Sequence, residues 1–195
     1  MITSLSQLDP NGSYTYADYL TWKFEEYVEL IKGRIFQMAA PSRMHQGIVS
    51  NLNFELRNFF INHRCKVYPA PFDVRLQRID KASSEMITTV VQPDICVICD
   101  KSKLDDRGCL GAPDLVVEIL SPGNTKKEMR QKYEVYEENG VLEYWLINPT
   151  DKNIFIYRLN SEGKFIGVQP LTDDDFLTTP IFEGMNIPVQ NIFED

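Results

Sequence analysis

The sequence lacks the features of membrane-spanning and secreted proteins. No apolar run approaches the roughly 18 uncharged residues that a transmembrane helix needs. The opening stretch, MITSLSQLDPNGS, has neither the basic block nor the apolar block of a signal peptide. The four cysteines among 195 residues do not form the framework of a small disulfide-rich scaffold. We therefore expect a soluble, cytoplasmic protein.

The cysteines also offer no metal site. Cys96 and Cys99 form a C-x-x-C pair, but they lie within DICVICD, a run that is typical of a β-strand. Residues three apart in a strand point to opposite faces, so these two thiols cannot chelate one metal ion. We interpret them as buried strand residues, because free cysteine is among the most often buried residue types.

Positive charge is scarce, with 20 basic against 28 acidic residues and a net charge of −8. Such a balance is unusual for a nucleic-acid partner, which normally requires a basic face. However, residues 171–195 hold six acids and no base, so the remainder of the chain is close to neutral. We interpret the acidic end as a solvated surface that aids solubility.

The chain has no internal repeat, low-complexity tract or Gly/Ser linker. Its composition, 43% apolar and 25% charged, is that of a globular domain. We expect one domain over residues 1–195, with a core over about 15–170 and an acidic C-terminal extension over 171–195.

Apolar periodicity and turn residues predict the order of the elements. Ile48, Leu52, Leu56 and Phe59 recur at helical spacing after the N-cap residue Ser42, so this helix should lie on a sheet. The full prediction is a mixed β-sheet flanked by helices. Its elements are a short helix over 15–23, a hairpin turning at Lys32-Gly33, a helix from Ser42 to about 63, extended runs at 66–76, 88–100 and 113–120, a helix from Thr125 to Asn139 ended by Gly140, paired strands at 142–149 and 153–159, and a strand at 164–170.

One apolar strand contains an acid that needs a partner. Glu118 stands between Val117 and Ile119 in GAPDLVVEIL, and a buried carboxylate is seldom left unpaired. Asp114 lies about 13 Å away along the strand, too far to share one metal ion, so we expect it at the strand entry. If 93–99 and 114–120 pair as an antiparallel hairpin across the loop 100–112, Asp94 comes opposite Glu118.

Two neighbouring carboxylates in an apolar sheet predict a cation between them, because their repulsion otherwise raises the pKa of one. A hard divalent ion such as Mg²⁺, or Mn²⁺ in its place, suits carboxylate oxygens. The helix that follows brings lysines, among them Lys132, towards the same site. A lysine there can orient a water molecule that attacks a phosphodiester, or stabilise the developing charge.

These residues resemble a known family. The stretches VELIKGRIFQM, PSRMHQ, QPDICVICD, GAPDLVVEILSPGNTKKEMRQKYEVY and GVLEYWLINP look like the Uma-two family of restriction endonucleases, within the PD-(D/E)XK nuclease superfamily. The resemblance spans about residues 26–158. It implies a restriction-endonuclease-like α/β core that hydrolyses DNA with Mg²⁺. Since superfamily members that cut both strands often act as dimers, it also raises the expectation of a homodimer.

Residue by residue, the resemblance makes Asp94 and Glu118 the metal ligands. It implies that Glu29 in the first hairpin and His45 in the first long helix contribute to the pocket. The sequence departs from the superfamily pattern at Leu120, where a lysine is expected. The resemblance implies that Lys132 on the next helix supplies this amine.

Other interpretations stay open. Leu120 favours a nuclease-fold protein that has no catalytic activity and binds nucleic acid or a protein partner. The excess of acidic over basic residues favours a metal-dependent hydrolase of small phosphate esters. Four of the site residues also have a structural alternative, namely strand entry for Asp94, a surface or helix-capping position for His45, an outward polar face for Glu29 and an ion pair with Glu128 for Lys132.

Overall fold

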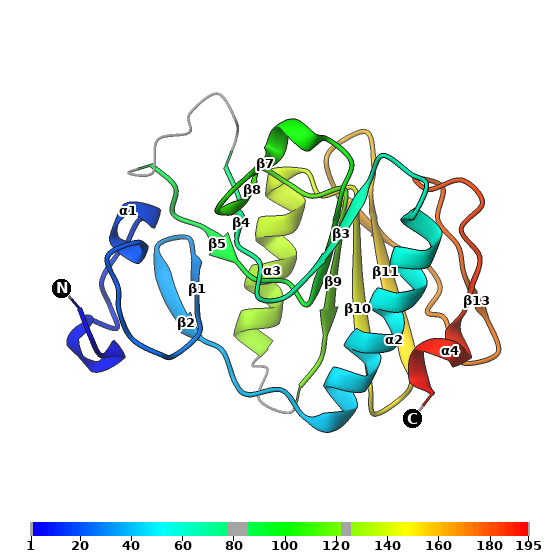
Figure 1. Ribbon diagram of the computed structural model, residues 1–195, viewed down its shortest axis with the longest axis horizontal. Coiled ribbons are helices and arrows are strands. Elements are labelled where there is room, and N and C mark those ends of the chain that lie inside the picture. Colours follow the sequence, from blue (N-terminus) through cyan, green and yellow to red (C-terminus); the bar gives the residue numbers. More distant parts are fainter. Residues whose placement is uncertain (1, 78–85, 122–125, 195) are drawn as a thin grey trace.

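The computed structural model describes residues 2–77, 86–121 and 126–194. Most of its regular secondary structure lies in two six-stranded sheets and two long helices (Figure 1). The elements in chain order are η1 (Leu5–Gln7), α1 (Tyr16–Tyr19), β1 (Val28–Ile31), β2 (Arg34–Gln37), α2 (Arg43–Phe60), β3 (Lys66–Pro69), β4 (Val74–Arg75), β5 (Val90–Val91), β6 (Ile95–Ile98), η3 (Lys101–Lys103), β7 (Leu104–Asp105), β8 (Gly108–Leu110), β9 (Leu115–Ile119), α3 (Lys126–Asn139), β10 (Glu143–Asn148), β11 (Asn153–Leu159), β12 (Phe165–Gly167), β13 (Phe176–Leu177), β14 (Ile187–Pro188) and α4 (Val189–Phe193).

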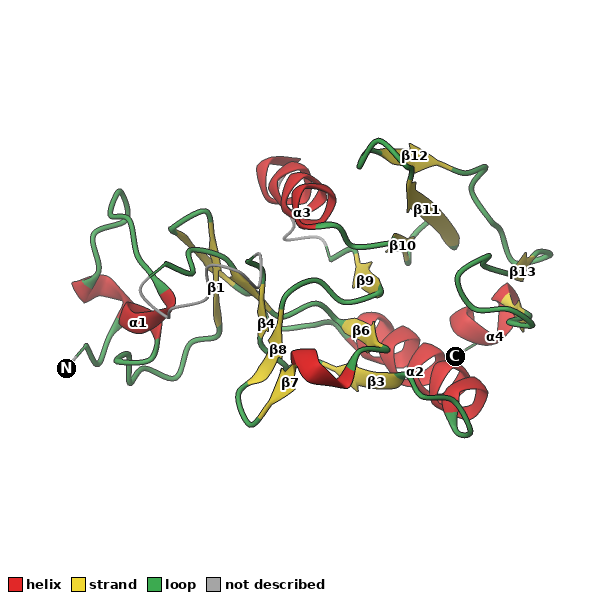
Figure 2. Cartoon of the chain, turned by 90° about the horizontal axis from the view of Figure 1, so that it is seen from above, coloured by secondary structure: helices red, strands yellow, loops and turns green. Residues whose placement is uncertain are grey.

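The central sheet has the strand order β12-β11-β10-β9-β6-β3. Strands β9 and β10 run parallel and the other neighbours antiparallel, so the sheet is mixed as predicted. Seen from above, α2 and α3 lie on opposite sides of this sheet (Figure 2). Its middle strands are therefore covered on both faces, which explains their almost wholly apolar sequences.

The second sheet has the order β2-β1-β5-β4-β8-β7 and is built from strands of two to four residues. Two of the predicted extended runs divide between the sheets. The run 66–76 supplies β3 to the central sheet and β4 to the second, and 88–100 supplies β5 and β6 in the same way. In place of the single mixed sheet that we expected, the described residues form two six-stranded sheets and a two-stranded sheet of β13 and β14.

The two predicted hairpins are confirmed. Lys32 and Gly33 both have positive φ, 49° and 78°, as a tight turn between β1 and β2 requires. Strands β6 and β9 pair antiparallel with Ile95 opposite Val117, so Asp94 comes opposite Glu118.

The connection between β6 and β9 is not the simple loop that we expected over 100–112. It forms η3 and the strands β7 and β8, and β8 pairs with β4 in the second sheet. The close approach depends on Gly108, since a Cβ there would lie 2.2 Å from the carbonyl oxygen of Asp73. A periodicity argument overlooks strands this short.

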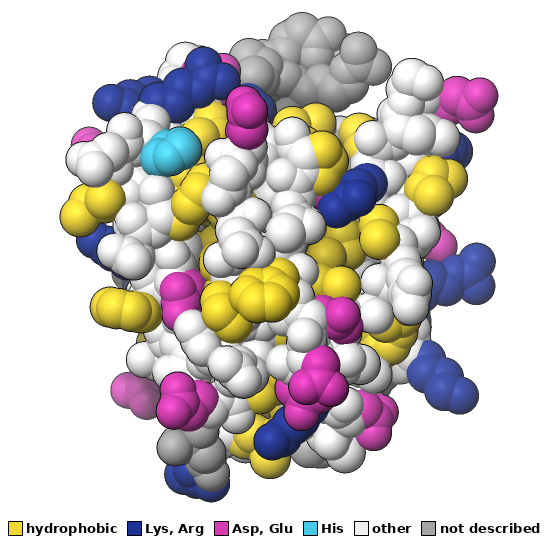
Figure 3. Space-filling model, turned by 90° about the vertical axis from the view of Figure 1, so that its right-hand side faces the viewer, with side chains coloured by type: hydrophobic (Ala, Val, Ile, Leu, Met, Phe, Trp, Pro, Cys, Tyr) yellow, Lys and Arg dark blue, Asp and Glu magenta, His cyan; other side chains and the backbone are white. Residues whose placement is uncertain are grey.

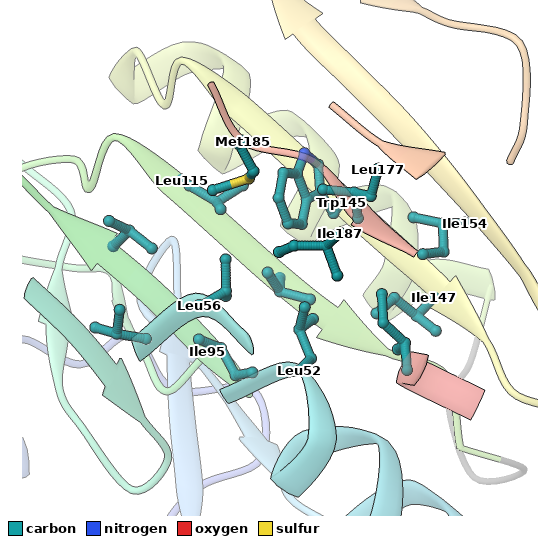
Figure 4. Packing of buried hydrophobic residues seen from close by; sticks show 14 of the residues in the cluster. Leu52, Leu56, Ile95, Leu115, Trp145, Ile147, Ile154, Leu177, Met185 and Ile187 are labelled. Atoms are coloured by element: carbon teal, nitrogen blue, oxygen red, sulfur yellow. The ribbon is translucent and has the colours of Figure 1, made fainter. Parts of the chain in front are cut away.

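The helix predictions hold with small shifts. Ser42 caps α2 by accepting a hydrogen bond from the backbone N–H of His45, and Leu52 and Leu56 pack on Ile95 and neighbouring strands (Figure 4). Phe60 rather than Phe59 takes the last fully buried position of the stripe. The short helix α1 ends at Tyr19 instead of residue 23, and α3 ends before Gly140, which has φ 84°. Thr125, the predicted cap of α3, lies outside the described residues.

The core does not stop near residue 170, so that expectation is wrong. Apolar side chains of the C-terminal segment lie beside Trp145 in the cluster that α2 covers (Figure 4). The buried ones are Leu177, Phe182, Met185, Ile187, Val189 and Ile192. Apolar residues spaced among acids in this segment carry the packing, while Asp173, Asp174 and Asp175 are exposed.

The cysteines are confirmed on opposite faces of the central sheet. Cys96 is buried in the cluster beneath α3, and Cys99 packs against the cluster beneath α2. The interpretation of Cys99 as a plain buried thiol is corrected, because it forms a disulfide with Cys65. The ladder explains the pairing: Lys66 lies opposite Ile98, which brings Cys65 and Cys99 to the next position. Within the described residues, no helix is long and apolar enough to cross a membrane.

Candidate active site

Glu118 points from β9 into the face of the central sheet that α3 covers. Only 9% of the residue is exposed to solvent. Both of its carboxylate oxygens accept hydrogen bonds from Lys132 Nζ, at 3.0 Å to Oε1 and 3.1 Å to Oε2. The hydroxyl of Tyr136 donates a further hydrogen bond to Oε1 at 2.5 Å. Glu118 therefore has protein partners that all come from one helix.

Helix α3 can supply both partners because Lys132 and Tyr136 are four residues apart, on one helical face. Lys132 is 7% exposed and also pairs with Glu29, whose Oε2 lies 3.0 Å from Nζ. An ammonium has three protons. Here they face three carboxylate oxygens of two glutamates. The partners of Lys132 in this buried site are therefore Glu118 and Glu29, in place of the helical ion pair with Glu128 that we considered.

Glu29 comes from β1 of the second sheet and is 1% exposed. All four residues of β1 are buried, so the outward polar face that we considered for Glu29 does not exist. Its Oε1 accepts the backbone N–H of Gln92 at 2.8 Å. Since Gln92 lies between β5 and β6, the site forms where the chain passes from the second sheet to the central one.

Asp94 completes the acidic group from the start of β6. Its Oδ2 accepts the backbone N–H of Ile119 at 2.7 Å, which ties it to the residue next to Glu118. His45 Nε2 lies 3.2 Å from the same oxygen and donates a hydrogen bond to it in the tautomer that carries the proton on Nε2. His45 is 6% exposed, and its Nδ1 is buried without a partner among the described residues.

Burial and neighbouring charges set the protonation of this group. Burial raises the pKa of Glu118 to about 8, against the lowering effect of Lys132, and the charges of Asp94 and Glu29 raise it further. Burial lowers the pKa of Lys132, but Glu118 and Glu29 together raise it well above its usual value. Lys132 therefore stays charged and is shared by Glu29 and Glu118, while the nearby charge of Asp94 opposes the ionisation of Glu118.

The donor set fits a hard divalent ion that keeps most of its water. Among the described residues, no group of three or more His, Cys, Asp and Glu side chains is placed to hold a metal ion. A closed zinc site is therefore a poor match. Mg²⁺ is commonly bound by only one or two carboxylates with waters and substrate phosphate, and Asp94 and Glu118 could supply these two.

Sequence reasoning missed two residues that matter here. Tyr136 carried no functional expectation, although its position four residues after Lys132 could have placed it on the site face. Gln92 gave no signal, because its contribution is a backbone N–H. Asp114 accepts the backbone N–H of Cys99 at 2.8 Å and so supports the strand pairing, as its expected position at the strand entry suggests.

Leu120, where the resemblance led us to expect a lysine, lines a small cavity together with Glu118 and Lys132. The cavity volume is about 10 Å³, close to the minimum of roughly 10–15 Å³ that one water molecule needs. Leu120 supplies no amine to this cavity, and the amine that contacts Glu118 is that of Lys132 from α3.

Comparisons with known proteins agree with this architecture. The Uma2 family, described as "Putative restriction endonuclease", matches residues 16–190. The uncharacterized protein slr1290 of Synechocystis sp. is 27% identical over 156 residues, which cover 76% of each chain. A crystal structure from Anabaena variabilis, of a "putative nuclease belonging to DUF820", has a TM-score of 0.72 and 21% identity, covering 92% of this chain and 97% of that one. The predicted restriction-endonuclease-like α/β fold is confirmed.

Proposed function

Since the chain belongs to the Uma2 family, we propose that it is an endonuclease that hydrolyses DNA phosphodiester bonds with Mg²⁺, or with Mn²⁺ in its place. The observation that carries the proposal is the buried group of three acidic side chains, whose mutual repulsion helps to raise the pKa of Glu118. Among the described residues, Glu29 and Glu118 share the ammonium of Lys132, and Asp94 lies beside Glu118, at the junction of the two sheets. A divalent cation would stabilise the ionised form of this group.

In this proposal Asp94 and Glu118 hold the ion. When bound, Mg²⁺ lowers the pKa of a water ligand and offsets negative charge on the scissile phosphate. Lys132 holds Glu118 in place and supplies positive charge next to the reacting phosphate. Glu29 keeps Lys132 protonated and fixed, and His45 keeps Asp94 oriented through its hydrogen bond to Oδ2.

The geometry favours a polymer lying across the surface over a small phosphate ester inside a pocket. Pockets for small ligands typically measure about 300–1,000 Å³, whereas the cavity beside Glu118 and Lys132 measures about 10 Å³. Lys126, Lys127 and Arg130 are exposed on α3, the helix that carries Lys132. On the face drawn in Figure 3, basic and acidic side chains are interspersed, so that face offers no continuous basic surface for a nucleic acid.

The test is cleavage of supercoiled plasmid and labelled single-stranded DNA in Mg²⁺ or Mn²⁺. The wild type is compared with Glu118→Gln and Lys132→Met, and the control is Lys127→Met, an exposed lysine of the same helix. We expect Lys132→Met to cut at least about 100-fold more slowly, as when one oxyanion donor is removed, and Lys127→Met to keep near-normal cleavage. Normal cutting by Lys132→Met, with the variant folded, would remove the lysine from the mechanism.

A catalytically silent nuclease-fold protein is the second candidate, and one observation favours it. All three protons of Lys132 face carboxylates of the protein, and its side chain is only 8% exposed, so the ammonium is fully used inside the fold. Mn²⁺ binding that depends on Glu118, without cleavage of plasmid, single-stranded DNA or RNA, would select this candidate over the enzyme.

A further inference from the structure

The two carboxylate oxygens of Glu118 accept different numbers of hydrogen bonds. Lys132 Nζ is almost equidistant from them, at 3.0 and 3.1 Å, so the lysine alone does not distinguish Oε1 from Oε2. Tyr136 donates to Oε1 only, at 2.5 Å. Each oxygen of an ionised carboxylate has two lone pairs. Oε1 is therefore fully used, whereas Oε2 accepts one hydrogen bond from the described residues.

Asp94 has the same asymmetry. Its Oδ2 accepts two hydrogen bonds, from the backbone N–H of Ile119 and from His45, while no hydrogen bond from another described residue reaches Oδ1. Each of the two carboxylates thus has one oxygen saturated by the protein and one with unused lone pairs. This arrangement suits a pair of ligands that each offer a single oxygen to a cation.

Tyr136 is well placed to impose the asymmetry on Glu118. Its side chain is fully buried, with 0% exposure, in the cluster between α3 and the central sheet. Its ring lies 5.2 Å from the ring of Tyr144, centroid to centroid. A ring packed in this way holds its hydroxyl at one position, so the hydrogen bond fixes the rotation of the Glu118 carboxylate.

We propose that Tyr136 is a positioning residue that saturates Oε1 of Glu118 and so leaves Oε2 as the oxygen available to a divalent cation. The proposal rests on the proposed function only in its assignment of Glu118 as a cation ligand. Tyr136 touches neither substrate nor cation and acts through Glu118. The chain requires a hydroxyl at this place as well as an aromatic ring.

The experiment is an equilibrium titration of the full chain with Mn²⁺, followed by the paramagnetic resonance signal of the free ion. We expect Tyr136→Phe to bind Mn²⁺ about 10–100-fold more weakly than the wild type, the usual effect of losing a hydrogen bond to a metal ligand. The matched control is Tyr133→Phe. Tyr133 lies one turn earlier on α3, and its hydroxyl contacts the carbonyl oxygen of Phe165 at 3.4 Å, so its loss should leave the affinity unchanged.

A second pair of variants separates the hydrogen bond from packing, including the case in which Tyr136→Phe does not fold. 4-Fluorophenylalanine at position 136 fills the space of the hydroxyl without a donor, and it should bind Mn²⁺ weakly. 4-Aminophenylalanine keeps a donor at the same place, and it should restore most of the affinity. Equal affinities for the two variants, or wild-type affinity in Tyr136→Phe, would overturn the proposal.

The same titration keeps this proposal distinct from the nuclease proposal. A wild type that binds Mn²⁺, loses affinity in Tyr136→Phe and cuts no nucleic acid would support the role of Tyr136 and overturn the endonuclease. A wild type that binds no Mn²⁺ would overturn the role of Tyr136 together with the metal assignment.

Discussion

Two glutamates are buried in adjacent strands of the central sheet, and their surroundings differ. Glu143 opens β10 with 0% exposure, and Glu118 lies near the end of β9 with 9%. Glu143 receives hydrogen bonds from Trp145 Nε1 at 2.8 Å, Arg158 Nε at 2.8 Å and Thr179 Oγ1 at 2.7 Å. One arginine balances the charge of Glu143, and two neutral donors, Trp145 and Thr179, also donate hydrogen bonds to its oxygens.

Glu118 is surrounded differently. Its cation, Lys132, is shared with Glu29, and the charge of Asp94 also raises the pKa of Glu118. Burial of an acid is therefore not evidence of function by itself, because Glu143 is the more deeply buried of the two. The evidence is the surplus of carboxylates over cations, which only the region of Glu118 has in this comparison.

The largest effect should come from removing the second carboxylate of the acidic group. Asp94→Asn keeps the shape of the side chain but removes a charge and replaces an acceptor by a donor. Cleavage should fall at least about 100-fold, because changing a residue that only hydrogen-bonds to a metal ligand already lowers metal affinity or activity about 10–100-fold. Plasmid nicking in Mg²⁺ measures this, with Glu143→Gln as the control. If Asp94→Asn cuts like the wild type, Asp94 is not a ligand.

Glu143→Gln should have the reverse profile. Gln has one amide oxygen in place of two carboxylate oxygens, so Arg158 loses its counter-charge and one donor faces an NH₂ group. We expect a loss of about 2–3 kcal/mol in the free energy of unfolding and unchanged cleavage per folded molecule. Urea denaturation followed by tryptophan fluorescence measures the first, and equal stability of variant and wild type would contradict it.

Stability without metal should fall with increasing pH through the range in which Glu118 titrates. Its folded pKa of about 8 lies above the ordinary value of 4.5, so the folded state binds more protons between these limits. The free energy of unfolding should decrease by up to about 1.4 kcal/mol per pH unit in this window and level off above it. Thermal melts in EDTA from pH 5 to 9 should show the slope in the wild type. Glu118→Gln lacks the titrating group, and an equal slope in that variant would refute the assignment.

His45 should have the smallest effect, because it acts through Asp94. His45→Ala removes one of the two hydrogen bonds to Oδ2 and leaves the backbone N–H of Ile119 in place. Cleavage should fall about tenfold, while His63→Ala, at an exposed position after the end of α2, should be unaffected. Initial rates at saturating Mg²⁺ distinguish the two, and equal rates would leave His45 a purely structural residue.

Much of the central sheet could be predicted from the sequence. Strand β9 and its antiparallel partner β6 have long apolar runs, and their pairing follows from the two acids and from chain direction. The second sheet could be predicted only at the hairpin of Lys32 and Gly33. Strands of two residues such as β4 and β7 have no periodicity, and they form through contacts between segments distant in sequence.

The candidate site, too, could be predicted only in part from the sequence. Asp94 and Glu118 were predicted to meet from strand geometry alone, and the structure brings them to neighbouring positions. Glu29 and His45 entered through family resemblance, because nothing in their local sequence shows which distant strand each will face. Lys132 was expected near the site together with other lysines of its helix, and the resemblance singled it out. Tyr136 was missed since a buried tyrosine is usually a core residue, and only its contact with Oε1 of Glu118 shows another role.

Thermal denaturation with and without Mn²⁺ tests most directly whether the surplus of carboxylates around Glu118 is a divalent-cation site. At a concentration about 100 times its dissociation constant, an ion that binds only the folded state adds about 2.7 kcal/mol of stability. The wild type and Glu143→Gln should both show this gain, and Glu118→Gln should show none. An equal gain in Glu118→Gln would mean that the ion binds elsewhere and that the surplus charge at Glu118 is not its site.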